Sequence, residues 1–310
     1  MPDSSPQNPI KGMAIMAGCM VVLPMMDAIA KYMATFETMS PGQVTFYRFF
    51  FQFLALLPIA FFVPGALRGG KRPFMNLLRG ALHAAASLMF FMAVKYMPLA
   101  DVFAIYFVEP FMLTMMSALF LGEKVGWRRW LAIVIGFGGA MIVIQPSYAI
   151  FGWTALLPVV CAFLYTLYLF LNRAIGDADL PLTMQFVAGV GGTLFMTVGL
   201  LLGHFVYPVE FEASLPSSSM GLLLLVILGS ISGYVHLLVV RAFRMAPLSL
   251  LAPFQYFEII SATVLGYLLF ADFPTLSKWL GIAIIVASGL FIIWRERARV
   301  KQLAAEPPVG

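Results

Sequence analysis

The sequence predicts an all-α integral membrane protein with ten transmembrane helices, arranged as two inverted five-helix repeats. Three observations predict this class: the composition, the regular alternation of apolar stretches with short polar loops, and an internal repeat. Hydrophobic residues make up 62% of the 310 residues, charged residues 11%, and the mean hydropathy is +0.94. Soluble domains are about half apolar and a quarter charged, so we expect this chain to lie in a lipid bilayer.

Ten apolar stretches are long enough to cross the hydrocarbon core as helices, which takes about 20 residues each. Helices are the expected form because every backbone polar group is then satisfied within its own segment. Proline and glycine punctuate most of the connecting loops. The predicted spans are 12–33, 41–63, 74–94, 99–121, 127–145, 153–172, 181–202, 220–243, 248–270 and 275–294.

The spans define four segments: a short N-terminus at 1–11, a first five-helix repeat at 12–146, a second at 152–294 and a basic tail at 295–310. With the N-terminus placed inside, the inner loops and the tail collect most of the lysine and arginine, whereas the outer loops hold only Lys95 and Lys278. This asymmetry follows the positive-inside rule. Both termini are therefore expected in the cytoplasm.

An internal repeat relates the two halves. Residues 98–145 reappear at 247–294 with an offset of 149 residues and no gap, which aligns Glu109 with Glu258. A fixed offset over this length indicates a duplication. Because each repeat has an odd number of spans, the two must enter the membrane in opposite orientations, a construction common in secondary transporters with a substrate site near the midplane.

Two carboxylates, Glu109 and Glu258, lie near the centres of apolar spans, where a charge costs about 2.5–3.5 kcal/mol. One turn earlier stand Tyr106 and Gln255, and the spacing of three puts each pair on one helix face. We expect these four residues to line a shared site for substrate binding or proton coupling. The alternative is that both carboxyls stay protonated as structural hydrogen-bond donors, so proton coupling and facilitated diffusion are both left open.

Arg48 is the centre of a second candidate group. An arginine side chain cannot lose its charge, and Asp27 lies at a comparable depth in the neighbouring span. Asp27 and Lys31 are one helical turn apart, which predicts a Lys31–Asp27–Arg48 network, and Gln52 shares the face of Arg48. This group could anchor an anionic or carbonyl group of a substrate; the alternative is a static clamp between helices.

Several other residues are weaker candidates. Tyr256, Tyr165 and Tyr168 present ring faces that could stack on a planar ligand. His83 and His236 are expected to be packing residues. The methionines and the two cysteines form no cluster with metal-ligand spacing, so we expect no metal site.

Several stretches carry a resemblance to a known family: residues 96–101, 109–110, 121–130, 136–139, 256 and 266–274. On these stretches, the chain resembles the drug/metabolite transporter superfamily, specifically its EamA-type ten-helix members, from about residue 12 to residue 294. Residues 27–31 and Arg48 are similar to the branch that includes riboflavin and S-adenosylmethionine importers. Ala271-Asp272 departs from the Gly-Glu found at the equivalent end of many members.

The resemblance implies a secondary transporter that moves a small organic metabolite across the bacterial inner membrane by alternating access, as a monomer or homodimer without a cofactor. The branch implies uptake of a vitamin-like or nucleoside-like solute, with riboflavin as the first choice. Export of amino acids, drugs or other metabolites is the alternative within the class. A channel or a membrane enzyme is the alternative outside it, but the sequence has no nucleophile motif or phosphate loop. The net charge of +5 comes from loops and tail, so no nucleic-acid partner is expected.

Overall fold

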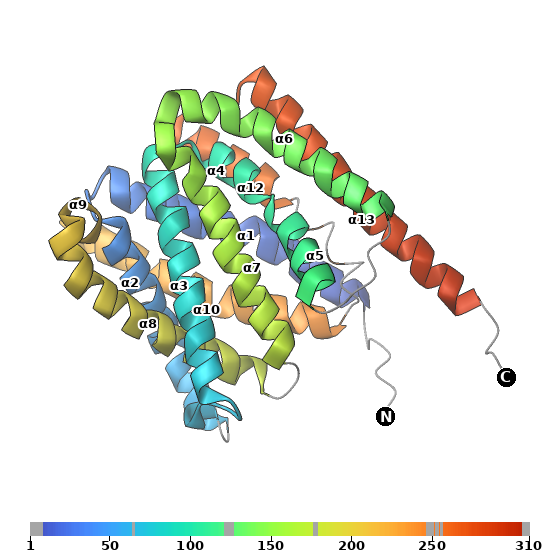
Figure 1. Ribbon diagram of the computed structural model, residues 1–310. Helices are drawn as coiled ribbons and strands as arrows, with labels where there is room; N and C mark the ends of the chain where they lie inside the picture. Colours follow the sequence, from blue (N-terminus) through green and yellow to red (C-terminus); the bar gives the residue numbers. More distant parts are fainter. Residues whose placement is uncertain are drawn as a thin grey trace.

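The computed structural model describes residues 9–63, 66–120, 127–175, 179–245, 251, 254 and 257–305. These residues form a bundle of long helices, with no β-strand among them (Figure 1). The all-helical class predicted from the sequence is confirmed. Six candidate membrane spans occur in this part of the chain, and one of them, Val134–Leu171, overlaps both the predicted fifth and the predicted sixth span.

Proline residues begin several helices, because the first helical turn does not need their missing N–H group. Pro41, Pro73 and Pro181 each stand at such a start, and the Ser40 hydroxyl accepts a hydrogen bond from the Gln43 N–H at 3.2 Å. The first-half elements are α1 (Pro9–Thr35), α2 (Pro41–Phe62), η1 (Ala66–Arg68), α3 (Pro73–Tyr96), α4 (Leu99–Tyr106), α5 (Glu109–Phe120) and α6 (Trp127–Phe151).

The second half repeats this sequence of long helices and short connections. Its elements are η2 (Gly152–Leu156), α7 (Leu157–Ile175), α8 (Pro181–Val206), α9 (Pro208–Phe211), α10 (Ser219–Met245), α12 (Phe257–Phe270) and α13 (Leu276–Ala305). Helix α13 continues well past the predicted end of the last span. Residues 295–305, which the sequence analysis assigns to a tail, therefore extend the final helix.

The predicted span 99–121 is not one helix. Helix α4 ends at Tyr106 and α5 begins at Glu109, with Phe107 and Val108 in a turn between them. Pro110 explains the break, because it has no N–H to donate and its ring clashes with the carbonyl four residues earlier. Glu109 therefore lies in the first turn of α5, where the helix dipole favours negative charge.

The aligned region of the second half has a related feature. Of the predicted span 248–270, the structure describes Leu251, Phe254 and helix α12, which begins at Phe257. Glu258 therefore also lies in the first turn of its helix, as Glu109 does in α5. The predicted site residues Gln255 and Tyr256 lie outside the described residues.

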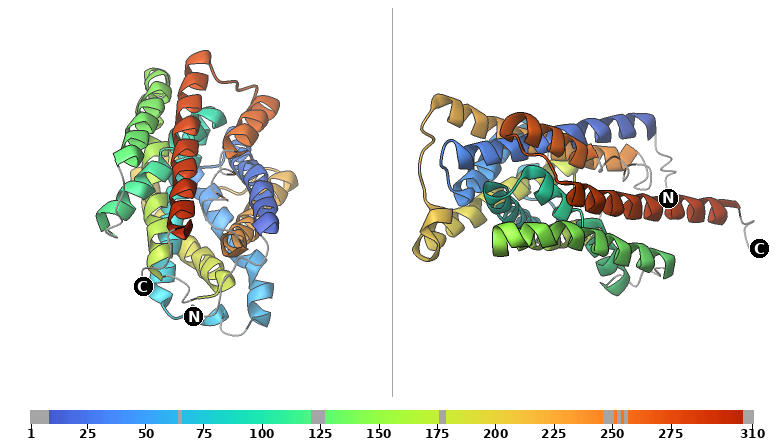
Figure 2. Two further views of the ribbon diagram at one scale, coloured as in Figure 1. Left: turned by 90° about the vertical axis from the view of Figure 1, so that its right-hand side faces the viewer. Right: turned by 90° about the horizontal axis from the view of Figure 1, so that it is seen from above.

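Helices from opposite halves pack side by side throughout the bundle. Helix α2 packs against α8 and α10, α3 against α7 and α8, α1 against α10 and α12, and α6 against α13. The pairing of α6 with α13 is visible in Figures 1 and 2, where the start of α1 and the end of α13 also lie toward the same end of the molecule. The hydrophobic core thus joins both halves into one unit.

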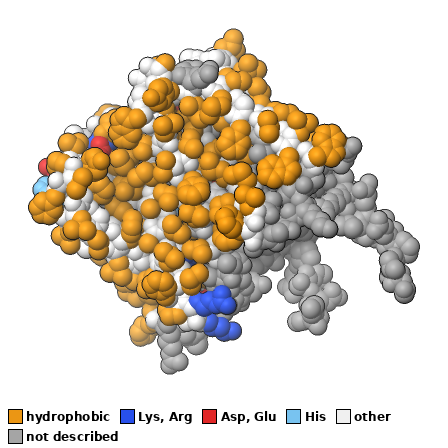
Figure 3. All heavy atoms as spheres, in the orientation of Figure 1, with side chains coloured by type: hydrophobic (Ala, Val, Ile, Leu, Met, Phe, Trp, Pro, Cys, Tyr) orange, Lys and Arg blue, Asp and Glu red, His pale blue; other side chains and the backbone are white. Residues whose placement is uncertain are grey.

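Large apolar side chains cover the outside of the bundle. Figure 3 shows a face that is mostly hydrophobic, with charged side chains only near its margins. Exposed examples are Phe61, Phe62, Leu201, Leu202 and Phe205. Soluble monomers rarely expose apolar patches larger than a few hundred Å², so this surface is suited to lipid contact and the chain is a multi-pass membrane protein.

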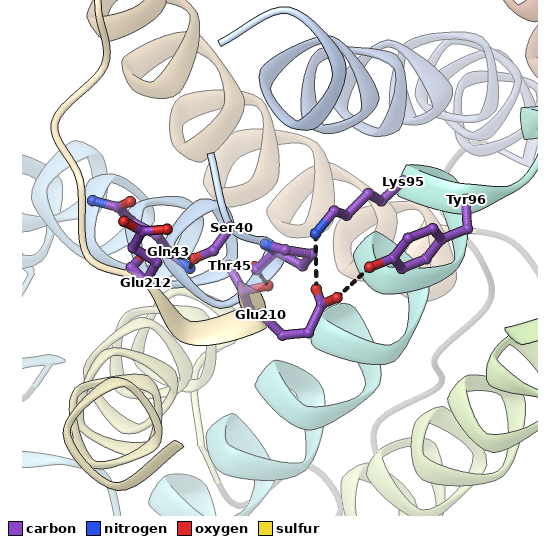
Figure 4. A network of polar contacts seen from close by, with 8 residues as sticks. Ser40, Gln43, Thr45, Lys95, Tyr96, Glu210 and Glu212 are labelled. Carbon is purple, nitrogen blue, oxygen red and sulfur yellow. Dashed lines mark hydrogen bonds and ion pairs between the residues drawn. The ribbon is translucent and has the colours of Figure 1, made fainter. Parts of the chain in front are cut away.

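The loop between α8 and α10 folds back over the ends of α2 and α3 (Figure 4). Glu210 in α9 pairs with the Lys95 ammonium, with the Oε2–Nζ distance at 3.2 Å, and accepts a hydrogen bond from the Tyr96 hydroxyl. The Ser40 hydroxyl donates to the Glu212 carbonyl at 2.8 Å. These contacts anchor the loop at this end of the bundle.

Glu37, in the connection between α1 and α2, anchors the start of α10. Its carboxylate accepts hydrogen bonds from the Ser217 N–H at 2.9 Å and the Ser218 hydroxyl at 2.5 Å. These bonds, with the Ser218 hydroxyl contributing most, hold the pKa of Glu37 below its usual value. A charged carboxylate is favourable here because it lies at a helix N-terminus.

Glycine permits a close helix contact between α3 and α8. A Cβ atom added at Gly80 would lie 2.6 Å from the Ala188 carbonyl oxygen, and one at Gly191 would lie 2.6 Å from the Leu77 carbonyl oxygen. Both obstacles are backbone atoms, which cannot rotate away as a side chain can. Small residues at such crossings are typical of membrane helices.

We expect Gly191→Ala to lower the stability of the detergent-solubilised protein by about 1–3 kcal/mol, the usual cost of overpacking. The measurement is the thermal unfolding midpoint. Gly138→Ala in α6 is the matched control, because a Cβ there meets nothing within 4 Å and alanine favours a helix over glycine. Equal midpoints for the two variants would contradict the close α3–α8 contact.

Candidate functional site

A cavity lies between the two halves of the bundle. Helices α1, α2, α3 and α4 line it from the first half, and α7, α10 and α12 from the second. Its volume is about 80 Å³, well below the roughly 300–1,000 Å³ of typical small-molecule pockets, so it must widen to hold an organic solute. The polar and aromatic lining residues include Asp27, Arg48, His83, Ser87, Phe90, Phe91, Phe103, Tyr106, Tyr165, His236 and Glu258.

The Arg48 guanidinium is held from two sides. On α3, it donates to the Ser87 hydroxyl and its Nη2 lies 3.1 Å from His83 Nε2; on α10, its Nε donates to the Ser232 hydroxyl at 3.1 Å. No carboxylate lies within ion-pair distance of the guanidinium in the part of the chain that the structure describes. A buried arginine fixed by neutral groups keeps its full charge for a ligand.

Further polar residues support this arrangement. The Gln52 side chain accepts from the Ser232 hydroxyl at 2.8 Å and donates to the Gln185 carbonyl at 3.1 Å. The Ser232 carbonyl oxygen accepts a hydrogen bond from His236 Nδ1 at 2.9 Å. Gln52 therefore lies behind Arg48 and orients it, while His236 reaches the cavity itself.

Two carboxylates face the same cavity as Arg48. Asp27 comes from α1 and Glu258 from the first turn of α12. Asp27 is close enough to Arg48 to interact electrostatically without forming an ion pair, and Glu258 interacts in the same way with Asp27. With all three groups ionised, the cavity carries two negative charges and one positive charge.

Aromatic rings cluster at the cavity, where His83, Tyr106 and Tyr165 line it and Tyr168 packs behind them. The His83 ring stacks on Tyr168 with centroids 4.6 Å apart and an interplanar angle of 25°. Tyr165 lies 5.2 Å from Tyr168 and 6.0 Å from Tyr106, again between ring centroids. Rings grouped in this way offer faces and edges to a planar ligand.

The cavity includes some of the predicted site residues and excludes others. Asp27, Arg48, Tyr106 and Glu258 line it. Glu109 is 5% exposed, and its Oε1 has no hydrogen-bond partner among the described residues, but it does not line the cavity. The two aligned glutamates are therefore not equivalent.

The predicted Lys31–Asp27–Arg48 network is wrong at Lys31. The Lys31 ammonium pairs with Asp272 and donates to the Met97 carbonyl at 3.2 Å. Asp272 lies just after α12, 241 residues away in the chain. Sequence spacing could detect only the partner one turn away, whereas packing of α1 against α12 supplies a closer one.

Sequence reasoning also missed cavity residues. His83 and His236 were expected to pack, yet both line the cavity, and Ser87 and Ser232 contact Arg48. A signal was present: the offset of 149 that aligns Glu109 with Glu258 also aligns His83 with Ser232 and Ser87 with His236. Each helix thus presents one histidine and one serine, four residues apart and in opposite order.

Comparison with known proteins identifies the family of this chain. The model of the EamA-like transporter family matches residues 10–145. A solved crystal structure superposes with a TM-score of 0.61 at 17% identity, covering 93% of this chain and 98% of that one. At this identity, the likeness shows the fold alone.

Three curated relatives are transporters of small metabolites by name. An S-adenosylmethionine uptake transporter of Rickettsia bellii is 27% identical over 87% of this chain and 89% of its own length. A riboflavin transporter of Vibrio cholerae is 30% identical, covering 73% of this chain and 74% of that protein. A pseudopaline exporter of Pseudomonas aeruginosa is 27% identical, covering 71% of this chain and 72% of that protein. The chain belongs to the EamA-like transporter family of the drug/metabolite transporter superfamily.

Proposed function

We propose that this transporter takes up a cationic metabolite that combines a planar heteroaromatic ring with an amino-acid group, with S-adenosylmethionine as the lead substrate. The observation that carries this proposal is the lining of the central cavity. Arg48 would bind the substrate carboxylate, Asp27 and Glu258 its positive groups, and the aromatic cluster around Tyr165 its ring. With both carboxyls ionised, the excess of one negative charge in the cavity complements a ligand with a net charge of +1.

The name of one relative supports S-adenosylmethionine as the substrate. The Rickettsia protein carries S-adenosylmethionine, whose ammonium, sulfonium and carboxylate groups match the cavity charges. Uptake is favoured over export because the S-adenosylmethionine relative is an uptake transporter by name, while the pseudopaline exporter keeps export open as a test outcome.

Riboflavin is the second candidate. The Vibrio relative is a riboflavin transporter, and a flat flavin ring could stack on the aromatic cluster. Riboflavin is neutral, however, and with both carboxyls ionised it would leave one of the two negative charges of the cavity without a counter-charge, which is unfavourable for buried groups. The charge of the cavity therefore favours the cationic substrate.

Alternating access between two inverted repeats is the proposed mechanism. Helix packing supports it. In the order of the spans, α1, α2 and α3 of the first half correspond to α7, α8 and α10 of the second. The α1–α10 contact then corresponds to α7–α3, and the α2–α10 contact to α8–α3, and all four contacts are present. The serine and histidine pairs around Arg48 follow the same relation. Cavities between such repeats can open to one side of the membrane at a time.

The substrate is tested by uptake of radiolabelled S-adenosylmethionine into proteoliposomes that contain the purified protein. We expect saturable uptake that unlabelled S-adenosylmethionine competes strongly. S-adenosylhomocysteine is the matched competitor, because it lacks the sulfonium charge, and it should compete at least about tenfold more weakly if that charge is worth 1.4 kcal/mol. Strong competition by riboflavin, or uptake of labelled riboflavin alone, would instead favour the second candidate.

The proposed orientation gives another prediction. Because basic residues gather on one side, we expect both chain termini and the α2–α3 loop in the cytoplasm. The measurement is activity of compartment-sensitive reporters fused after residue 310 and inserted after Gly70. A periplasmic reporter signal at either position would refute the orientation, and opposite signals at the two positions would also refute the inverted arrangement.

A further inference from the structure

Four charged residues, three of them buried and Asp272 partly exposed, join the two halves at one end of the cavity. Lys31 of α1 pairs with Asp272, just after α12, and Asp101 of α4 pairs with Lys278 of α13. Each pair takes one residue from the first half and one from the second. Asp101 also lies close enough to Lys31 and Asp272 to interact electrostatically with both, so the four residues form a single cluster.

The cluster lies directly beyond the cavity along two helices. Lys31 is one helical turn past the lining residue Asp27 on α1, about 6 Å further along the axis. Asp101 is in the first turn of α4, and the lining residues Phe103 and Tyr106 follow in the same helix. In the proposed orientation, this end of the bundle faces the periplasm.

Three of these charged side chains are almost completely buried. Asp101 is 1% exposed, Lys278 5% and Lys31 8%. A buried ion pair is rarely more stabilising than apolar residues of similar size, so stability alone does not explain two adjacent pairs. Ion pairs can, however, be replaced by hydration when a passage opens, which gives two discrete states of similar free energy.

The backbone at Asp272 supports the same interpretation. Ala271 has a φ of 56°, a left-handed conformation that usually requires glycine and costs other residues about 1–2 kcal/mol. Two hydrogen bonds, from the Ala271 N–H to the Tyr267 carbonyl at 3.0 Å and from the Asp272 N–H to the Gly266 carbonyl at 3.1 Å, close the turn. The turn directs Asp272 toward Lys31 despite this cost.

We propose that Lys31, Asp101, Asp272 and Lys278 are the outer gate of this transporter, whose two ion pairs close the cavity to the periplasm and separate when it opens outward. This inference rests on the proposed alternating access but on no particular substrate. The small volume of the cavity fits a state in which this gate is closed. Opening must move α1 and α4 away from α12 and α13.

Accessibility of a native thiol tests the gate without any substrate. The protein has two cysteines, both free: Cys161 lines the cavity, whereas Cys19 lies in a separate packing cluster. In a Cys19→Ala background, we expect Asp101→Asn combined with Asp272→Asn to raise the rate at which a membrane-impermeant maleimide labels Cys161 from the periplasmic side. The expected increase is at least about tenfold, equivalent to 1.4 kcal/mol.

Two variants control for indirect effects. Lys95→Ala removes an ion pair outside the gate, between Lys95 and Glu210, which joins α3 to the α9 loop and not to α12 or α13; labelling of Cys161 should stay at the parent rate. The charge exchange Lys31→Asp with Asp272→Lys should return labelling toward that rate. Labelling of the asparagine variant from right-side-out and inside-out vesicles identifies the side that opened.

A second measurement applies if removing charge impairs folding. Lys31→Cys combined with Asp272→Cys, bridged by a short bifunctional thiol reagent, should hold the gate closed and abolish transport, and a reducible reagent should allow transport to recover. Parent-level labelling in the folded asparagine variant, or full transport by the bridged protein, would overturn the gate. The labelling result needs no substrate, so failure of the proposed substrate specificity would leave it unchanged, and the two proposals fail separately.

Discussion

Replacement of Arg48 by alanine is expected to reduce substrate uptake by at least about thirtyfold, because losing one partner of a buried, hydrogen-bonded charge pair costs roughly 2–5 kcal/mol. The guanidinium is 3% exposed, and its described contacts are neutral groups. The bound carboxylate would therefore have no other positive group at the same place. The measurement is the initial rate of uptake per amount of protein in the membrane.

Arg48→Lys tests whether geometry matters in addition to charge. Lysine keeps the positive charge but presents it at a single point, so it cannot contact Ser87 and Ser232 on opposite helices while also binding substrate. We expect a loss close to that of Arg48→Ala. Arg241→Ala, an exposed arginine on α10, is the control and should transport normally. Near-parent uptake by a folded Arg48→Lys protein would show that Arg48 acts only through its charge.

Glu258→Gln and Glu109→Gln should have different effects, although the two residues align in the repeat. Glutamine keeps the shape of glutamate and its hydrogen-bonding capacity but carries no negative charge. Glu258 lines the cavity and Glu109 does not. We expect Glu258→Gln to weaken binding of the cationic substrate about thirtyfold, or roughly 2 kcal/mol, and Glu109→Gln to leave it nearly unchanged. Substrate binding to the purified variants measures this difference.

The same pair of variants addresses proton coupling. If Glu109 exchanges a proton during transport, Glu109→Gln should lose accumulation against a gradient yet retain exchange of labelled for unlabelled substrate. Counterflow and concentrative uptake, measured in proteoliposomes at a series of pH values, separate these activities. Equal substrate affinity in both glutamine variants and the parent would contradict the assignment of Glu258 to the substrate site.

The prolines illustrate what sequence alone could not decide about the fold. Pro24 and Pro58 lie inside the continuous helices α1 and α2, whereas the chain breaks before Pro110. All three lack the N–H group and should disturb a helix. The outcome depends on whether neighbouring helices and side chains satisfy the freed backbone groups, which sequence spacing does not report.

Sequence by itself determined the membrane class, the approximate positions of most long helices, and Arg48, Asp27 and Glu258 as candidates for the site. It could do so because lipid imposes a fixed length on apolar segments and makes an intramembrane charge costly unless it has a use. Tertiary structure alone decided the partners: Ser87, His83 and Ser232 for Arg48, and Asp272 for Lys31. Side-chain spacing predicts contacts within one helix, but partners on different helices depend on which faces pack together, and that is a property of the assembled bundle.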